Sequence, residues 1–569
     1  MTNTYDGNGN RLTETSATGT ITSTYDQRNR LTSTVNTAGG GTVSYGYDLA
    51  GNTVKVTDAQ GTVTHEYDPS EVLTSTTYPT SSGTAKQLYK TDDHGRRTDT
   101  WLNATPNADP AKDPEVWAAH QKLTYDKSGK VTRVQASADS AAPKVIVDTT
   151  YCYLAGIAVG AACTATDGAN DRDRLQWLKD NISEQTTEYD YTAKASDGAT
   201  SNTTRLQKAT QAGGDTNSTW TYTYDSAGNR LTETVTGDRS TSQALKFNAV
   251  GQITNNGYSY DGTGNMTAAP GATFTYNGAQ QMTSSTKDGK KTTYSYAGAD
   301  MNRLLSQRTE DGPEYKYTYG KGLTSREVSG SGVASVLTDP TTGQPLNLRT
   351  TDGATSMWVL DGIGSPAAAI ADTGEKAYTV SYDPYGTEVV TYGEDSQQWK
   401  QNPFGFKGGI RAGEKNSLTK FGYRWQSATT GGWTQRDTFD APLDPNNANR
   451  YAYAGDDPIN SSDSTGRWVN VSLNVCVIVC GSFGRSQYGS DWAVNGGLGL
   501  APSRGVGPSV SWGEGAAGAD EGWTTDYSVG PVTGSRSDSG EWSYSLDPTN
   551  FGPSAGIGRS YNTVMPVTY

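Results

Sequence analysis

The stretch Tyr5-Asp6-Gly7-Asn8-Gly9-Asn10-Arg11-Leu12-Thr13 returns with few changes as Tyr224-Asp225-Ser226-Ala227-Gly228-Asn229-Arg230-Leu231-Thr232. Aspartate can accept hydrogen bonds from backbone amides two residues on, and glycine or asparagine tolerates the left-handed backbone conformation. The Asp-x-x-Gly-Asn stretch therefore predicts a tight turn. The run before the second copy, Trp220-Thr-Tyr-Thr-Tyr, alternates aromatic and hydroxyl side chains, which is the pattern of a half-buried β-strand. Each unit thus predicts a strand, a turn and a returning strand.

The same unit recurs along the first half of the chain, and the first four copies start at residues 5, 25, 47 and 67, a period of about 20 residues. Further copies begin at Tyr25-Asp26, Tyr47-Asp48, Tyr67-Asp68, Tyr125-Asp126 and Tyr260-Asp261, and degenerate ones at Phe247-Asn248, Tyr276-Asn277 and Tyr296. Units of this kind bury their faces only against their neighbours. The tyrosines and aspartates can be read as a surface for sugars or partners, or as ladder and turn residues of a scaffold. We favour the scaffold interpretation.

Composition supports an all-β repeat protein. The 569 residues include 67 glycines and 34 tyrosines, and the hydrophobic content of 33% is low for a single packed core. The regular aromatic spacing argues against disorder. A net charge of −14 argues against a general nucleic-acid binder, which needs a basic surface to meet phosphates.

Two stretches interrupt the period and are interpreted as insertions near residues 103–120 and 152–200. We expect short helices within them, at Pro114–Lys122 and Asp171–Ile182. Cys152 and Cys163 flank a small loop and can form a disulfide, whereas Cys476 and Cys480 would lie on one strand too far apart to bridge. No metal-ligand spacing is present, so neither a metal nor a cofactor is expected.

The N-terminus shows no signal peptide, because Met1 leads directly into a repeat unit. A repeat array is expected to begin with an atypical cap, which suggests that a longer protein precedes this stretch or that its start is misplaced. The sequence contains no apolar run of about 20 residues, so no transmembrane helix is expected. The expected location is secreted or at the cell surface.

A second set of motifs begins near residue 357. In order, they are Trp358-Val-Leu-Asp361-Gly, Tyr382-Asp383-Pro384-Tyr385-Gly386, Phe404-Gly-Phe406-Lys-Gly408, Phe421-Gly-Tyr-Arg424-Trp425, Thr430-Gly431-Gly-Trp433-Thr-Gln-Arg436-Asp437, Asn449-Arg450-Tyr451-Ala-Tyr453 and Asp457-Pro458-Ile-Asn460. This series resembles the RHS repeat-associated core domain of bacterial RHS polymorphic toxins and toxin-complex C subunits and, more distantly, teneurins. The resemblance covers about residues 1–466. It divides the chain into repeats (1–356), a core domain (357–466) and a variable C-terminal segment (467–569).

The resemblance implies repeats that spiral into a hollow β-shell, a core domain that plugs one end, and a C-terminal segment carried as an effector. In several members the core cleaves the chain with acidic residues and an arginine. By motif position the candidates are Asp437 as the catalytic carboxylate, Arg424 as its partner and Asp463, which opens the degenerate cleavage motif. The expected cleavage site lies at Gly466-Arg467-Trp468, most simply after Arg467.

Two departures from the family pattern affect this chemistry. Ser427 replaces an aspartate of the family motif, and the proline and leucine of the cleavage motif are absent. Peptide cleavage needs one group to activate the attacking water and another to protonate the leaving amine. The competing interpretation is an Arg424–Asp437 ion pair that only holds the plug in place.

The segment 467–569 predicts a small β-domain. An amphipathic first strand at 468–480 is followed by strands at Ser490–Leu500, Val510–Trp512, Trp523–Val529, Trp542–Leu546 and Ile557–Val567. The segment has no histidine or lysine, which disfavours a histidine-dependent nuclease. An Arg–Glu pair as in ADP-ribose transferases, a membrane-active hairpin assembly and an inert adhesive tail all stay open.

Three functions follow. The first is a shell for a C-terminal effector, with that effector as its own cargo and an immunity protein as a further partner. The second is an extracellular adhesive module that binds glycans or neighbouring cells. The third is an autoprotease, which is compatible with the first.

Overall fold

The computed structural model describes a nearly continuous body up to residue 467 and short strands beyond it. The described residues are 2–37, 41–81, 83–164, 174–194, 200–214, 216–298, 303–413, 418–438, 448–467 and 470–471, and the seven strands given below for the C-terminal segment. The chain forms two compact units, one holding Met1–Lys90 and Arg97–Leu473 and the other built chiefly from Asn474–Tyr569. Almost all of the described secondary structure is antiparallel β-sheet, as the composition predicted.

The first sheet contains 19 strands, each paired with its neighbours in chain order. Its strands are β1 (Thr2–Tyr5), β2 (Arg11–Ser16), β3 (Gly19–Tyr25), β4 (Leu31–Asn36), β5 (Thr42–Tyr47), β6 (Thr53–Asp58), β7 (Gly61–Tyr67), β8 (Leu73–Thr80), β9 (Gly83–Thr91), β10 (Arg97–Ala104), β11 (Ala119–Tyr125), β12 (Val131–Ala138), β13 (Lys144–Cys152), β14 (Trp177–Asp180), β15 (Thr186–Asp190), β18 (Lys208–Ala212), β19 (Ser218–Tyr224), β20 (Arg230–Gly237) and β21 (Thr241–Ala244). A separate hairpin pairs β16 (Thr192–Lys194) with β17 (Thr200–Asn202).

The second sheet is a 14-stranded meander. It consists of β22 (Ser259–Tyr260), β23 (Met266–Ala269), β24 (Ala272–Tyr276), β25 (Met282–Lys287), β26 (Lys290–Tyr296), β27 (Leu304–Thr309), β28 (Glu314–Tyr319), β29 (Leu323–Val328), β30 (Gly332–Thr338), β31 (Pro345–Arg349), β32 (Thr355–Leu360), β33 (Pro366–Ala371), β34 (Lys376–Tyr382) and β35 (Glu388–Tyr392). This sheet crosses residue 357 without a break. The boundary between repeats and core domain at 356/357 is therefore not a sheet edge and stays a sequence-based proposal.

The repeated Asp-x-x-Gly-Asn stretch forms the same turn throughout. In the first copy, Oδ1 of Asp6 accepts hydrogen bonds from the amides of Asn8 (3.0 Å) and Asn10 (2.8 Å), while Oδ2 accepts one from the Asn10 side chain (2.8 Å). Gly9 has a φ of +84°, which glycine adopts without a steric penalty. The acceptor oxygen plays the same role at Asp26, Asp68, Asp126, Asp225, Asn248, Asp261, Asn277, Asp361 and Asp383.

In several units the tyrosine ties its strand to the preceding return strand. The Tyr47 hydroxyl donates to the carbonyl of Leu31 (2.6 Å), and Tyr67 donates to that of Thr53 (2.8 Å). Pairing shifts register immediately before Tyr47 and Tyr67, in agreement with a β-bulge that redirects the side chain. Burial raises the pKa of Tyr47 to about 12, so its hydroxyl keeps the proton that it donates. These tyrosines therefore form a ladder of hydrogen bonds between neighbouring strands of the first sheet.

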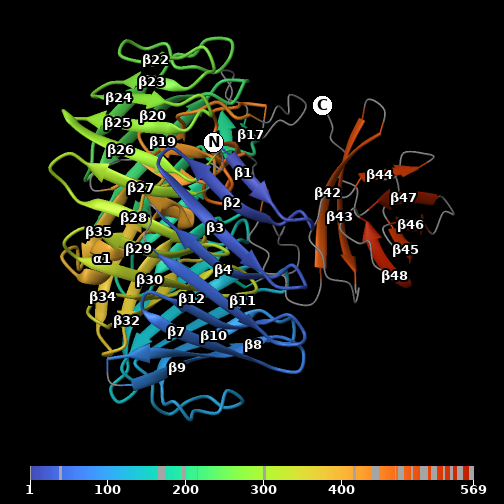
Figure 1. Ribbon diagram of the computed structural model, residues 1–569. Helices are drawn as coiled ribbons and strands as arrows, with labels where there is room; N and C mark the ends of the chain where they lie inside the picture. Colours follow the sequence, from blue (N-terminus) through green and yellow to red (C-terminus); the bar gives the residue numbers. More distant parts are fainter. Residues whose placement is uncertain are drawn as a thin grey trace. The chain divides into compact units, whose positions relative to one another are not determined.

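The two large sheets, drawn from blue to green and from green to gold in Figure 1, are joined along a polar seam, where β28 lies against β4 and β5. The carbonyl of Tyr319 accepts hydrogen bonds from Thr34 and Asn36 at 2.8 and 3.0 Å. Farther along, Arg349 and Asp58 form an ion pair of 2.6 Å in which each side chain is only 4% exposed. Apolar residues of both sheets share one large cluster, so the principal core lies between them.

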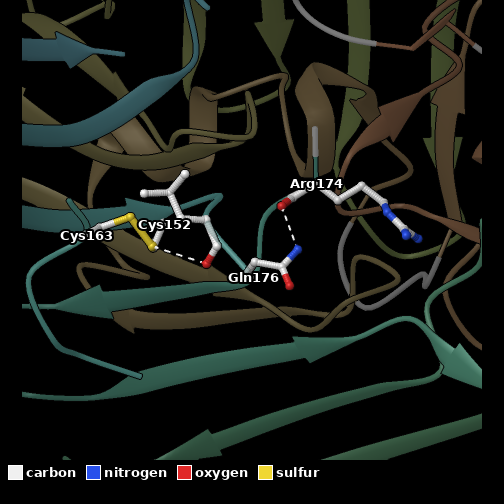
Figure 2. The surroundings of a disulfide bond; sticks show 5 residues. Cys152, Cys163, Arg174 and Gln176 are labelled. Atoms are coloured by element: carbon white, nitrogen blue, oxygen red, sulfur yellow. Dashed lines mark hydrogen bonds between the residues drawn. A yellow bond between two sulfur atoms is a disulfide. The ribbon is translucent and has the colours of Figure 1, made fainter. Parts of the chain in front are cut away.

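Both helices expected in the insertions are wrong within the described residues. Residues 105–118 are irregular and lead into strand β11, and the stretch expected as a helix near 171–182 contains strand β14 where it is described. Pairing with β10 and β13 prevails over the local helical pattern in these two places. Cys152 and Cys163 form the disulfide that the sequence allowed, next to the turn that carries Arg174 and Gln176 (Figure 2).

The part of the core domain that follows β35 forms smaller elements. They are α1 (Gln397–Gln401), the 3-10 turns Phe406–Gly408 and Ala454–Asp456, the four-stranded sheet β36 (Ile410–Arg411), β37 (Leu418–Phe421), β38 (Arg424–Ser427) and β39 (Gly432–Trp433), and the pair β40 (Ser461–Ser462) and β41 (Asn470–Val471). Trp425 of β38 is 1% exposed and contacts Tyr294 and Tyr296 of β26. This packing fixes the strand that carries Arg424.

The C-terminal segment contains a hairpin and a five-stranded sheet. The hairpin pairs β42 (Cys480–Tyr488) with β43 (Asp491–Gly499), and the sheet has the order β44 (Val510–Gly513), β47 (Trp542–Leu546), β46 (Val532–Ser537), β45 (Gly522–Val529) and β48 (Ala555–Asn562). Each of the five later strands expected from sequence is present, and β42 and β46 are additional. Most of the expected first strand lies outside the described residues, as does Cys476.

Candidate functional site

Arg424 is the centre of the site that the sequence singled out. Its side chain is 6% exposed, and its Nη2 lies 2.7 Å from Oδ2 of Asp437 and 2.9 Å from Oδ2 of Asp463. Asp463 is 1% exposed. Burial lowers the pKa of the Arg424 guanidinium, and the two carboxylates act in the opposite direction. The structure therefore brings all three sequence-predicted side chains into one buried cluster.

The same arginine contacts the backbone at the expected cleavage site. Nε of Arg424 donates to the carbonyl oxygen of Gly466. The amide of the next residue, Arg467, donates to Oδ1 of Asp463 at 3.1 Å. The Gly466–Arg467 peptide group is thus held at its oxygen by the guanidinium and at its nitrogen by a carboxylate. Trp468 lies outside the described residues.

Surrounding side chains orient the arginine and the aspartates. The guanidinium of Arg424 lies 4.1 Å from the ring centroid of Trp433, and its Nη1 donates to the carbonyl of Arg450 at 3.0 Å. Arg450 in turn donates through Nε to the backbone carbonyl of Asp437 at 2.9 Å. These contacts leave Arg424 little rotational freedom.

No role for Trp433 or Arg450 could be predicted from the sequence, although both belong to motifs of the core series. Trp433 reaches Arg424 from the neighbouring strand β39, and Arg450 reaches both Arg424 and Asp437 from a later segment of the core domain. Ser427, the residue in place of the family aspartate, accepts a long hydrogen bond from the amide of Thr430 (3.4 Å) in the turn after β38. Its described bond is therefore to that turn rather than to Arg424.

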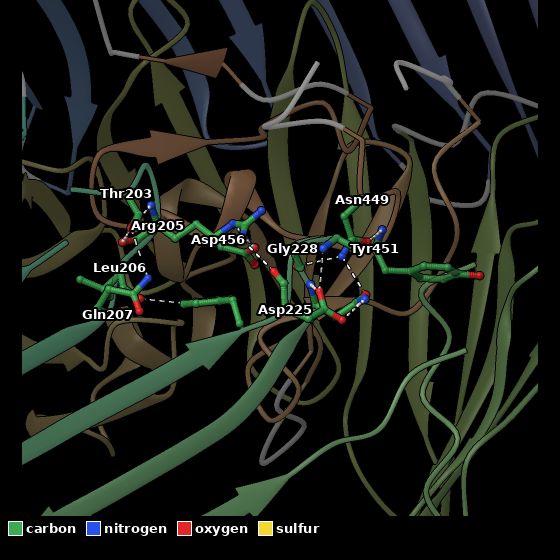
Figure 3. A network of polar contacts seen from close by, with 12 residues as sticks. Thr203, Arg205, Leu206, Gln207, Asp225, Gly228, Asn449, Tyr451 and Asp456 are labelled. Atoms are coloured by element: carbon green, nitrogen blue, oxygen red, sulfur yellow. Dashed lines mark hydrogen bonds and ion pairs between the residues drawn. The ribbon is translucent and has the colours of Figure 1, made fainter. Parts of the chain in front are cut away.

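A second polar network anchors the core segment to the first sheet (Figure 3). The backbone carbonyl of Asp456 accepts a hydrogen bond from the amide of Leu206 (3.0 Å), and its carboxylate pairs with Arg205 at 3.4 Å. Asn449 donates to the carbonyl of Gly228 at 2.8 Å. Burial raises the pKa of Asp456 to about 7. The network ties the Asn449 end of the segment 449–456 to the repeat turn at Gly228 and its Asp456 end to the loop before β18.

Nothing in the described part of the chain groups three or more metal-ligating side chains. A small cavity of about 30 Å³ lies between Arg230, Gly431 and Tyr451, too small for a substrate molecule. Within the same described residues, no helix is long and apolar enough to span a membrane.

The family model for the teneurin YD-shell matches residues 170–459, about half of the chain. The chain belongs to the teneurin YD-shell family. A model for the RHS repeat also matches residues 47–82 of this YD-shell chain. These matches confirm the resemblance that the repeats and the core motifs indicated.

Two curated bacterial proteins are similar to part of this YD-shell chain. The tRNA3(Ser)-specific nuclease WapA of Bacillus spizizenii is 27% identical over 261 residues, and the tRNA nuclease WapA of Bacillus subtilis is 26% identical over 261 residues. Each alignment covers 44% of this chain and 11% of the relative, so the chain aligns with about a tenth of the relatives' length. A solved Photorhabdus luminescens Tc holotoxin pore structure matches with 13% identity and a TM-score of 0.49, covering 83% of this chain and 28% of that one.

Proposed function

We propose that this YD-shell chain is the scaffold of a polymorphic toxin-like protein and that its core domain cleaves the Gly466–Arg467 peptide bond. Cleavage would separate the shell and core, up to residue 466, from the variable segment 467–569. The observation that carries the proposal is the Arg424 cluster, which holds both ends of this single peptide group.

From this geometry we propose a role for each side chain. Nε of Arg424 faces the carbonyl oxygen of Gly466 and stabilises the negative charge that develops there as water attacks. Asp437 acts as the base that takes a proton from this water. Oδ1 of Asp463 accepts a hydrogen bond from the Arg467 amide at 3.1 Å and so orients the peptide group, and the proton taken from the water is delivered to the Arg467 nitrogen as the C–N bond breaks. A C–O bond forms, the C–N bond breaks, and the products are a new carboxylate on Gly466 and a new amine on Arg467.

This assignment places the scissile bond one residue before the position expected from the motif. The sequence comparison favoured cleavage after Arg467. The polarised carbonyl belongs to Gly466, and the Arg467 guanidinium lies 3.4 Å from the ring centroid of Tyr423. We therefore propose Arg467 as the first residue of the released segment.

The segment 467–569 is proposed to be the effector cargo. WapA relatives are named as tRNA nucleases, and their similarity to this chain covers only about a tenth of their length. The identity of the cargo's target, an immunity protein and a secreted or cell-surface location all belong to this proposal. Expression of residues 467–569 in bacterial cells tests it: growth arrest supports an effector, and undisturbed growth with soluble protein accumulation contradicts an intracellular toxin.

Self-cleavage is tested on purified full-length protein by denaturing gel and N-terminal sequencing. The expected result is a small fragment that begins at Arg467. Asp437→Asn and Arg424→Lys should abolish it, because they remove the base and the carbonyl contact. Asp58→Asn, which disturbs a buried ion pair in the distant seam, is the matched control and should still cleave. An intact unaltered chain after prolonged incubation would refute the proposal.

A further inference from the structure

Besides the Asp456 network, the stretch immediately before the Arg424 cluster is held on the first sheet by the side chain of Asn460, whose Nδ2 also donates to the carboxylate of Asp457 at 3.0 Å. Oδ1 of Asn460 accepts a hydrogen bond from the amide of Leu175 at 2.7 Å, and its Nδ2 donates to the hydroxyl of Tyr191 at 2.8 Å. The Tyr191 hydroxyl itself donates to the carbonyl of Leu175 at 2.8 Å. Asn460, Leu175 and Tyr191 thus form a closed polar ring, which we call the Asn460 seat.

The Asn460 seat is buried and stiff. Leu175 is 0% exposed and Tyr191 is 4% exposed, and both belong to the principal core. Ile459, the residue before Asn460, is 3% exposed in that core, and its carbonyl accepts a hydrogen bond from Nζ of Lys407 at 3.1 Å. Residues 459 and 460 are therefore held by their side chains, by a backbone carbonyl and by apolar packing.

The part of the seat that the first sheet contributes is also held by its neighbours. Arg174, the residue before Leu175, lies with its guanidinium 4.4 Å from the ring centroid of Tyr191. Gln176 follows Leu175 in the chain. Its amide donates to the carbonyl of Cys152 at 2.8 Å, next to the disulfide (Figure 2). The seat thus lies on a part of the first sheet that is held on both sides of Leu175.

Only the short strand β40 separates Asn460 from Asp463, so little chain is available to absorb a displacement of the seat. A shift at Asn460 moves Oδ1 of Asp463 relative to the Arg467 amide and moves the Gly466 carbonyl relative to Arg424. We infer that Asn460 is a positioning residue for the Arg424 cluster, through its seat on Leu175 and Tyr191. The inference rests on the proposed self-cleavage.

The first test compares cleavage rates of full-length variants. Asn460→Ala should cleave about tenfold more slowly or worse, since a displacement of about an ångström is costly to catalysis. Its pH profile should keep the midpoints of the unaltered protein, because Asp437 and Asp463 are intact. Tyr191→Phe should lose less, and the double variant should be no slower than Asn460→Ala, because both changes open the same ring. An Asn460→Ala rate equal to the unaltered rate, or fully additive losses, would overturn the inference.

A matched control separates positioning from general damage. Asn347 is also buried and donates to Gln87 across the seam at 2.7 Å, well before the Arg424 cluster and residues 449–467 in the chain. Asn347→Ala should lower the unfolding midpoint about as much as Asn460→Ala and leave cleavage unchanged. An equal loss of cleavage in Asn347→Ala would show a merely structural effect and overturn the inference.

Hydrogen exchange keeps the inference testable if the unaltered protein does not cleave at all, an outcome that refutes the proposed function alone. The reporters are the amide of Arg467, bonded to Asp463, and the amide of Tyr423, bonded to the carbonyl of Thr465 at 2.9 Å. Asn460→Ala should exchange at both amides at least tenfold faster, and Asn347→Ala should not. Unchanged exchange in Asn460→Ala would show that the seat does not position this peptide.

Discussion

Removal of the Cys152–Cys163 disulfide should lower the free energy of unfolding by about 3 kcal/mol. The bridge joins cysteines separated by 11 residues, and closing a loop of that length in the unfolded chain accounts for roughly this amount. Cys152 is 0% exposed at the end of β13, so a serine at that position would add a buried hydroxyl to the cost. Cys163→Ser therefore isolates the loss of the bridge.

Denaturant unfolding with and without dithiothreitol measures the effect, in a background where Cys476 and Cys480 are replaced by serine. The reductant should lower the unfolding midpoint of the protein that has the bridge to that of Cys163→Ser, and it should leave Cys163→Ser unchanged. The loosening should appear by hydrogen exchange at the amide of Gln176, which is bonded to the Cys152 carbonyl. A midpoint insensitive to the reductant, or equally sensitive in Cys163→Ser, would refute the reasoning.

Three further outcomes are expected, each followed by denaturant unfolding. Asp48→Ala should lower the free energy of unfolding by about 1–3 kcal/mol, because two backbone amides and one side-chain amide lose a charged acceptor. Asp48→Asn should lower it less, since two natural repeats use asparagine in this turn. Equal losses in the two variants would contradict the acceptor role. Tyr67→Phe should cost about 1 kcal/mol, because the Thr53 carbonyl loses its 2.8 Å hydroxyl partner, and no loss would contradict the ladder. Because burial raises the pKa of Asp456 to about 7, its contribution to the free energy of unfolding is complete below pH 4 and is lost as pH rises through 7. Asp456→Asn should therefore flatten the fall of the free energy of unfolding between pH 4 and 7. An unchanged slope of that free energy against pH would contradict this assignment.

The repeat was predictable because its determinants are local. The Asp6 turn depends on a carboxylate, two amides and a glycine within five consecutive positions, and all of them are visible in the sequence. The alternating pattern around Trp220 likewise sets the faces of one strand by itself. The helices expected in the insertions failed for the opposite reason. A short local pattern at 171–182 carries no information about the neighbouring strand β13, with which β14 pairs.

The three side chains of the Arg424 cluster could be predicted from motif order, and their arrangement could not. The sequence placed Arg424 and Asp437 together, but it gave no sign that Arg424 also meets Asp463 and the Gly466 carbonyl. These contacts decide which peptide bond is polarised. They depend on β38 packing against the second sheet and on the return of the chain after β40.

The sequence by itself determined the strand–turn–strand unit, the all-β class and the order of the core motifs, because each follows from side chains a few residues apart. Only the tertiary structure decided how the two sheets join, where Asn460 is seated and which peptide group Arg424 holds. The seam and the seat join residues that lie hundreds of positions apart, such as Asn347 with Gln87 and Asn460 with Leu175. Contacts between residues so far apart in the chain form only when both sheets have formed, and no local sequence pattern predicts them.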